Sequence, residues 1–211
     1  MKITKIYPAL ILFFILLSGC IEFNDSNYTS DSSYSSYDKY NFIQTHEHFY
    51  GSVYRVVDGD TVYVVAPNGT EYKIRLLGVD TPETYIKNKP YEYFIDENTA
   101  MTDINYLKEW GYKATDFAKE NLENKTVIVV FDKLSPRKGK YGRYLAYIFI
   151  NNTTYGIQKP KVFVNFNEEL VKNGYARVYI SNFELKDVFL EYEKHAKSQR
   201  IGMWNWSGAN N

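Results

Sequence analysis

The chain has 211 residues, of which 45% are hydrophobic and 18% aromatic, and 25 basic side chains balance 25 acidic ones. This composition fits one globular domain with appendages, and it excludes a protein that attracts nucleic acid through a large overall positive charge. Contact with nucleic acid would therefore depend on local clusters of basic residues.

Residues 1–20 combine two lysines with a short apolar run and end in Leu17-Ser18-Gly19-Cys20. The run is too short to cross a bilayer comfortably and has the form of an export signal. Its last four residues resemble a lipobox, in which cleavage leaves the cysteine as a lipid-modified N-terminus. We therefore predict a signal peptide over residues 1–19 and an exported protein anchored to the cell membrane at Cys20, the only cysteine. An ordinary signal peptide, with secretion, and an uncleaved anchor are the alternatives.

Residues 20–45 are rich in Ser, Tyr and Asp and low in branched aliphatic residues, so we predict a disordered tether before a folded domain over residues 46–206. His46-Glu47-His48 stands at the junction. Its spacing can bind a transition metal from a strand, but two nitrogens are few for a tight site. The alternative is a solvated start of the first strand.

Residues 54–83 contain short runs of Val and Ile that are interrupted by Asp58-Gly59 and Asn68-Gly69. Both dipeptides favour turns, which predicts a strand, a turn, a strand, a hairpin and a third strand. Charged residues lie at defined places in this pattern. Asp60 comes after the first turn, Arg75 lies in the third strand, and Asp80-Thr81-Pro82-Glu83 follows that strand.

These charged residues suit phosphodiester hydrolysis. Asp60 and Asp80 are hard oxygen ligands that could hold Ca²⁺ together with the carbonyl of Thr81 and water. The Arg75 guanidinium matches two phosphate oxygens, and Glu83 is left to act on a water. Taken singly, each has a simpler interpretation as a turn, the start of a helix or a solvated strand residue.

The rest of the chain alternates predicted helices and strands. Residues 85–101, rich in Tyr, Asn and acids, would shape a substrate groove or form an irregular surface loop. Apolar residues at spacings of three and four predict a helix over 102–123, which Gly111 would kink or split. A strand over 127–132 and a basic loop lead to a further strand from which Tyr141 and Arg143 alternate outward. Further elements are predicted as a helix over 166–174, a strand over 175–180 and a helix over 183–199.

Three motifs in this order resemble the thermonuclease (staphylococcal nuclease) family over residues 51–204: Asp58-Gly59-Asp60-Thr61, the run from Ile74 to Thr84, and the run from Lys140 to Tyr147. The resemblance implies an α+β fold, a five-stranded Greek-key β-barrel of the OB type with three helices. It also implies a Ca²⁺-dependent nuclease, a monomer, that cleaves single-stranded or frayed DNA and RNA and leaves 3′-phosphate ends.

The resemblance further assigns roles to residues. Asp60, Asp80 and Thr81 would bind the metal, Arg75 and Arg143 would hold the phosphate, and Glu83 would act as general base or water-positioning group. Residues 85–101 are an insertion relative to the family.

Substrate contacts follow less directly. Lys140 and Tyr141 match positions that contact a terminal phosphate. The base-stacking tyrosine of the family falls on Ile180, so we predict stacking on its neighbour Tyr179. Two other classes remain open at this point: a non-catalytic nucleic-acid-binding OB module and an envelope lipoprotein that binds a polymer.

Overall fold

The computed structural model describes residues 37–84, 88–151 and 163–208. The predicted signal peptide, Cys20 and the first part of the predicted tether lie outside the described residues. Within the described ranges, no helix combines the length and the apolar character needed to cross a membrane.

Within the described residues, five strands close into a barrel: β1 (His48–Asp58), β2 (Thr61–Val65), β3 (Glu71–Leu76), β5 (Thr126–Val130) and β6 (Tyr144–Asn151). Their order is β3-β2-β1-β5-β6, and a parallel pairing of β3 with β6 closes the circle. The other barrel pairs are antiparallel. This mixed barrel confirms the predicted α+β fold.

Two short strand pairs add to the barrel. β7 (Phe163–Asn165) pairs with β6, and β4 (Val79–Asp80) pairs with β8 (Arg177–Val178) as a separate antiparallel ribbon. The pairing of β4 with β8 matters for the site, because it joins the second of the three motifs to a segment almost a hundred residues later.

The strands form where the sequence alternates buried branched residues with exposed ones. In β2 and β3 the side chains of Val62, Val64, Ile74 and Leu76 are almost fully buried, which places one face of each strand in the barrel interior. The hairpin between these strands contains Gly69 with φ +82°, a backbone conformation that glycine adopts without steric cost. The predicted succession of strands and turns is confirmed.

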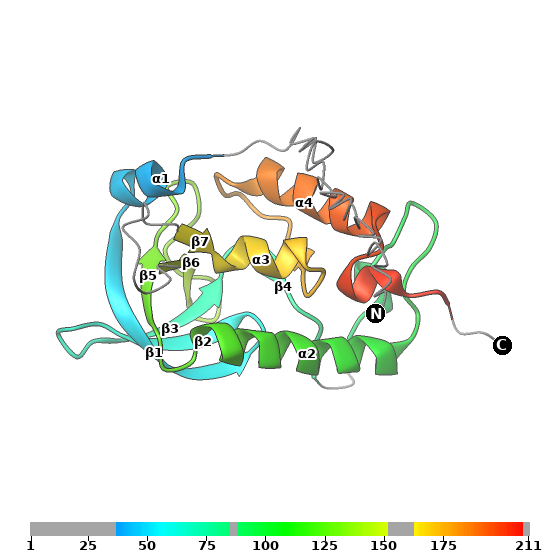
Figure 1. Cartoon of the computed structure of the whole chain (residues 1–211), viewed down its shortest axis with the longest axis horizontal. Coiled ribbons are helices and arrows are strands. Elements are labelled where there is room, and N and C mark those ends of the chain that lie inside the picture. The colour runs from blue at the N-terminus through cyan, green and yellow to red at the C-terminus, as the bar shows by residue number, and fades with distance from the viewer. Residues whose placement is uncertain (1–36, 85–87, 152–162, 209–211) are drawn as a thin grey trace, which may run out of the picture. The chain divides into compact units, whose positions relative to one another are not determined.

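Three predicted helices are present, as α2 (Ile104–Leu122), α3 (Phe166–Lys172) and α4 (Lys186–Ser198). Asp103 and Asn165 cap the first two by accepting hydrogen bonds from backbone N–H groups. Figure 1 shows α2 running along one side of the molecule and α4 along the other, with α3 between them. Gly111 does not split α2, which is continuous.

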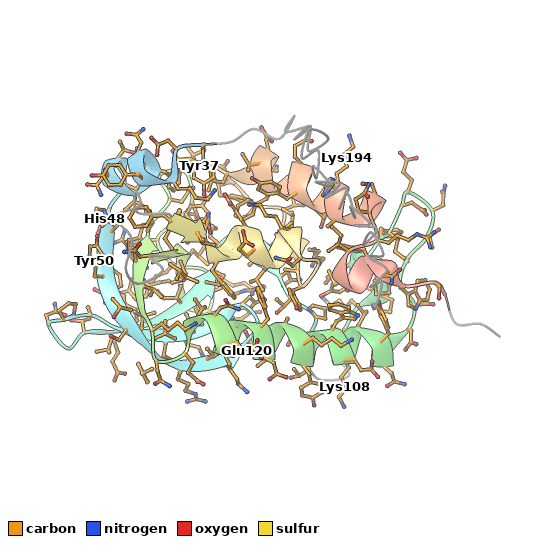
Figure 2. The ribbon with its side chains drawn as sticks, in the orientation of Figure 1. Tyr37, His48, Tyr50, Lys108, Glu120 and Lys194 are labelled. Carbon is orange, nitrogen blue, oxygen red and sulfur yellow. The ribbon has the colours of Figure 1, made fainter. Side chains whose placement is uncertain are left out.

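A further helix, α1 (Lys39–Thr45), corrects the predicted tether over residues 20–45. Asp38 caps it, and the side chain of Ile43 is fully buried in the main core. Tyr37, at the start of α1 (Figure 2), accepts a hydrogen bond from Nδ2 of Asn165 at 2.9 Å. The composition of this stretch is polar, but a few apolar side chains at helical spacing are sufficient to dock it.

His46 is also corrected by the structure, because it is neither a solvated residue nor part of a metal cluster. Its ring is buried, with Nε2 at 2.7 Å from Oε2 of Glu184 and Nδ1 at 2.6 Å from the carbonyl of Phe42. In the described ranges, no three His, Cys, Asp or Glu side chains gather as a metal cluster. The imidazole links the end of α1 to the segment before α4.

The described part of the insertion, residues 88–101, is largely irregular and exposed, as one interpretation of this segment predicted, but it is anchored at a few buried positions. It contains a short 3-10 helix, η1 (Pro90–Glu92), and an isolated bridge between Phe94 and Ala100. Its buried side chains form a second apolar cluster with α2, α4 and η2 (Gly202–Asn205), made of Tyr93, Met101, Leu107, Ala196, Met203 and Trp204.

We predict that Ile43→Ala lowers the free energy of unfolding by about 2–5 kcal/mol, because it leaves a cavity where α1 enters the core. Urea denaturation measures the change. Ile104→Ala, at an exposed position at the start of α2, is the matched control and should change the free energy by about 0.5 kcal/mol or less. Equal effects of the two substitutions would contradict the docking of α1.

Candidate active site

A cavity of about 480 Å³ opens where the ends of several barrel elements meet. It is lined by the β1–β2 turn, the end of β3, the β4 segment, the loop before β6 and the residues after β8. The sequence-predicted side chains in its wall are Asp60, Arg75, Asp80, Glu83, Lys140, Tyr141, Arg143 and Tyr179. The structure therefore brings together residues that are more than a hundred positions apart in the chain.

The turn between β1 and β2 is held close to the Asp80–Glu83 segment. Asp58 accepts a hydrogen bond from the backbone N–H of Asp60 at 3.1 Å, which fixes the turn. A Cβ atom at Gly59 would lie 2.8 Å from the Cβ of Ala114 and 2.8 Å from Cγ2 of Thr81. Only glycine allows the turn to come this close to α2 and Thr81.

Asp60 is the buried carboxylate of the site. Its Oδ2 accepts hydrogen bonds from the backbone N–H of Thr81 at 2.9 Å and from the Thr81 hydroxyl at 3.0 Å. Its Oδ1 accepts from the hydroxyl of Thr61 at 3.2 Å and contacts Nη1 of Arg75. These partners compensate the cost of burying the charge and fix the direction of the carboxylate.

Arg75 joins the two aspartates. Its side chain projects from β3 into the cavity, where Nη1 contacts Asp60 and Nη2 donates to Oδ1 of Asp80 at 2.6 Å. Burial lowers the pKa of the Arg75 guanidinium, while the charge of Asp80 opposes this shift. The two carboxylates thus converge on one cationic group.

Glu83 lies at the wall of the same cavity with its side chain exposed. Its backbone is fixed by Asn88, whose Oδ1 accepts from the Glu83 N–H and whose Nδ2 donates to the Glu83 carbonyl, both at 2.7 Å. Loss of hydration raises the pKa of Glu83, and the nearby charges of Asp58 and Asp80 raise it further against the opposing effect of Arg75.

α2 supports this segment through a close approach. A Cβ atom at Gly111 would lie 2.6 Å from the carbonyl oxygen of Pro82 and 2.9 Å from the carbonyl carbon of Glu83. The glycine that weakens the helical pattern is therefore the point where the Pro82–Glu83 backbone rests on α2.

Arg143 reaches the cavity from the segment before β6, the strand that pairs with β3. It precedes β6, so the prediction that Tyr141 and Arg143 alternate out of that strand is wrong; a turn with Gly142 at φ +74° carries them. Nη1 of Arg143 donates to the Thr61 hydroxyl at 3.2 Å. This bond places a second guanidinium beside the β1–β2 turn.

The predicted substrate contacts are exposed around the cavity. The side chain of Tyr141 is 72% exposed, with Nζ of Lys140 4.8 Å from its ring centre. Tyr179 is 51% exposed and Ile180 61%, but only Tyr179 lines the cavity. Both tyrosine rings are thus accessible to a ligand.

The donor set fits a hard divalent cation. Four acids of the cavity wall, Asp58, Asp60, Asp80 and Glu83, face three bases, Arg75, Lys140 and Arg143. This excess of carboxylate favours a bound cation, and oxygen is the ligand atom that Ca²⁺ prefers. Of these four acids, Asp60 and Asp80 share a cationic partner, Arg75. They would be the carboxylate ligands of a metal, and carbonyl oxygens and water would complete its coordination.

Sequence reasoning missed three residues that fix this site: Asn88, Glu92 and Arg177. Arg177 makes a salt bridge to Oδ2 of Asp80 at 2.7 Å and another to Oε2 of Glu92 at 3.0 Å. Asn88 and Glu92 lie in the insertion, where no motif marks them. The pairing of Arg177 with Asp80 arises only from the ribbon of β4 and β8.

The closed barrel with an acid- and arginine-lined cavity defines the class of fold, and similarity to known sequences shows the family. A profile described as "Staphylococcal nuclease homologue" matches residues 73–206. The thermonuclease of Staphylococcus hyicus is 32% identical over 155 residues, covering 72% of this chain and 74% of that protein. The thermonuclease of Staphylococcus intermedius is 30% identical over 154 residues, with coverage of 72% and 74%.

The chain therefore belongs to the staphylococcal nuclease family. The profile begins within β3, so it includes Arg75, Asp80, Glu83 and Arg143, whereas Asp60 precedes it. An uncharacterized protein of Methanocaldococcus jannaschii is 60% identical over 200 residues, covering 93% of this chain and 92% of that protein.

We predict that Gly111→Ala destabilises the protein by about 1–3 kcal/mol, because the new Cβ collides with backbone atoms that cannot turn aside. The collision outweighs the gain in helix propensity, which is about 1 kcal/mol. Thermal unfolding measures the change. Gly139→Ala meets only Leu145 side-chain atoms, the nearest at 3.5 Å, and serves as control. A Gly111→Ala protein more stable than the wild type would contradict the close approach.

Proposed function

We propose that the protein is a Ca²⁺-dependent endonuclease (phosphodiesterase) that cleaves DNA and RNA, with a preference for single-stranded or frayed substrate. The observation that supports this best is the convergence of Asp60 and Asp80 on Arg75, in a cavity that also contains Glu83 and Arg143. Membership of the staphylococcal nuclease family points to the same chemistry.

Asp60, Asp80 and the carbonyl of Thr81 are the proposed ligands of the cation. Bound there, Ca²⁺ would neutralise a phosphate oxygen and orient the attacking water. Thr81 contributes in a second way, since its N–H and hydroxyl already hold Asp60 in place. Because the carboxylate is already held in position, less conformational entropy is lost when a ligand binds.

The two arginines are the proposed phosphate-binding groups. Arg75 and Arg143 line the cavity from neighbouring segments, β3 and the turn before its partner strand β6. Two planar guanidinium groups can donate to several phosphate oxygens and stabilise the negative charge that develops in the transition state. To do so, Arg75 has to exchange its carboxylate partners for the phosphate.

Glu83 is the proposed group that positions water or accepts its proton. Its side chain is exposed at the cavity, and Asn88 holds its backbone, so the carboxylate is accessible from a fixed point of attachment. The raised pKa of Glu83 makes it a stronger base than an ordinary glutamate. We propose cleavage of the 5′ P–O bond, which leaves a 3′-phosphate.

The substrate would lie across the exposed residues at the rim. Lys140, Tyr141 and Tyr179 line the cavity and are exposed, and stacking of a base on a tyrosine does not require a particular sequence. Unpaired bases offer their faces for stacking, which supports the preference for single strands. We propose that the enzyme acts as a monomer.

We predict that Glu83→Gln lowers kcat by about 10²–10⁴-fold, because glutamine cannot accept a proton. In the wild type, kcat should fall as the pH drops through the raised pKa of Glu83, since only the carboxylate form is active. This acid limb should lie above the ordinary glutamate value of about 4.3. Degradation of single-stranded DNA, followed with Ca²⁺ or with a chelator, measures both effects.

Glu120→Gln is the matched control, because Glu120 is exposed on α2 (Figure 2) and should leave kcat unchanged. Cleavage that persists in chelator, or that is unaffected by Glu83→Gln, would contradict the proposed mechanism. Tight binding of DNA without any cleavage by the wild type would instead identify a binding module.

We also propose that the mature protein is exported and anchored to the membrane by lipid at Cys20. The support is the sequence alone, namely the apolar run that ends in Leu17-Ser18-Gly19-Cys20. We predict that Cys20→Ser moves the protein out of the membrane fraction, because the lipid supplies the membrane affinity. Immunoblots of membrane and soluble fractions measure this, and an unchanged distribution would contradict lipid attachment at Cys20.

A further inference from the structure

Asp80 is held from two sides. Its Oδ1 accepts from Nη2 of Arg75 at 2.6 Å, and its Oδ2 contacts Nη2 of Arg177 at 2.7 Å. The second contact has a backbone origin, because Asp80 and Arg177 are directly opposite each other in the ribbon of β4 and β8. Side chains of opposite residues in an antiparallel pair lie on the same face and within reach of each other.

Arg177 is fixed in turn by the insertion. Its Nη2 lies 3.0 Å from Oε2 of Glu92, at the end of η1, and its guanidinium carbon lies 5.5 Å from the ring centre of Tyr93. Tyr93 is only 2% exposed and belongs to the second apolar cluster. The insertion is thus anchored in the second apolar cluster, which holds Glu92 and Tyr93 close to Arg177.

The charges of this group are balanced. An unpaired guanidinium beside Asp80 would repel a cation at the same carboxylate. Glu92 supplies a compensating negative charge, so Asp80 keeps its attraction for a cation while Arg177 fixes its orientation. Both Arg177 and Asp80 are largely buried, with side chains 15% and 20% exposed, so water screens these interactions only weakly.

We propose that Arg177, held by Glu92, is a positioning residue that directs Asp80 towards the metal. The insertion is then part of the active site, although none of its described residues lines the cavity. This inference depends on the proposed Ca²⁺-dependent function. It assigns a role to a segment that the family resemblance leaves without one.

The geometry favours arginine over lysine at position 177. Nη2 makes both contacts, to Asp80 and to Glu92, while the planar group lies near Tyr93. A lysine would keep the charge but not the flat group or its fixed direction. Arg177→Lys should therefore retain part of the effect, whereas Arg177→Met should lose all of it.

The test measures Ca²⁺ binding directly, by isothermal titration calorimetry of the full-length protein without nucleic acid. Arg177→Met should weaken Ca²⁺ binding by about 10- to 100-fold, which is typical when a group that orients a metal ligand is removed. Glu92→Gln should weaken it by a smaller factor, and Arg177→Lys should give an intermediate value. Because the two residues act as one unit, Glu92→Gln should have no further effect in the Arg177→Met background.

Enzyme assays supply a second readout. The half-saturating Ca²⁺ concentration should rise in Arg177→Met, and saturating Ca²⁺ should restore most of kcat. Lys197→Met is the control, since Lys197 belongs to a comparable ion pair with Glu193 on α4, at 3.2 Å, and contacts the ring of Trp204. It should change neither the Ca²⁺ affinity nor the half-saturating concentration.

The outcomes separate the two proposals. A folded Arg177→Met protein with the Ca²⁺ affinity of the wild type would overturn the positioning role, even if its melting temperature fell. If Arg177→Met does not fold, Glu92→Gln decides, because Glu92 is partly exposed, and wild-type affinity in that variant overturns the inference. A wild-type protein that neither binds Ca²⁺ nor cleaves nucleic acid would overturn the proposed function itself.

Discussion

The shared contact of Asp60 and Asp80 with Arg75 is the interaction on which the site depends. Buried carboxylates repel one another and are stable only when a cation and hydrogen-bond donors compensate their charge. The barrel meets this requirement by placing Arg75 on β3, between a turn that carries Asp60 and a short strand that carries Asp80. The same requirement makes the site suitable for an exchange of cations. When the Arg75 guanidinium turns to a phosphate, a second cation can replace it beside the two carboxylates.

Around this contact, the chain uses separate devices to fix each acidic residue. The N–H and hydroxyl of Thr81 hold Asp60, Asn88 holds the backbone of Glu83, and Arg177 holds Asp80. Two of these three devices depend on residues 88–101 or on their contact with Arg177. The second apolar cluster therefore supports the site, because it anchors residues 88–101, which contact the backbone of Glu83 and the side chain of Arg177.

Local sequence patterns were sufficient to predict the strands of residues 54–83 and the helices α2, α3 and α4, whereas the closed barrel was predicted from the family resemblance. Short apolar runs with Asp-Gly and Asn-Gly turns indicate strands, and the predicted acids and arginines stand at the ends of those strands. Helix α1 was missed because Tyr37, Phe42 and Ile43 are few among polar neighbours. Arg177 and Glu92 were missed because their partners come from distant segments, and no local pattern encodes a pairing across almost a hundred residues.

The central claim is that Asp60 and Asp80 share one cation site next to Arg75. A crystal structure of the protein grown with Ca²⁺ and a non-hydrolysable nucleotide tests it most directly. We predict a single strong density peak about 2.3–2.6 Å from a carboxylate oxygen of each aspartate, with the Arg75 guanidinium turned to the phosphate. A Ca²⁺ ion bound elsewhere, with Arg75 still bridging both aspartates while the nucleotide occupies the cavity, would contradict it.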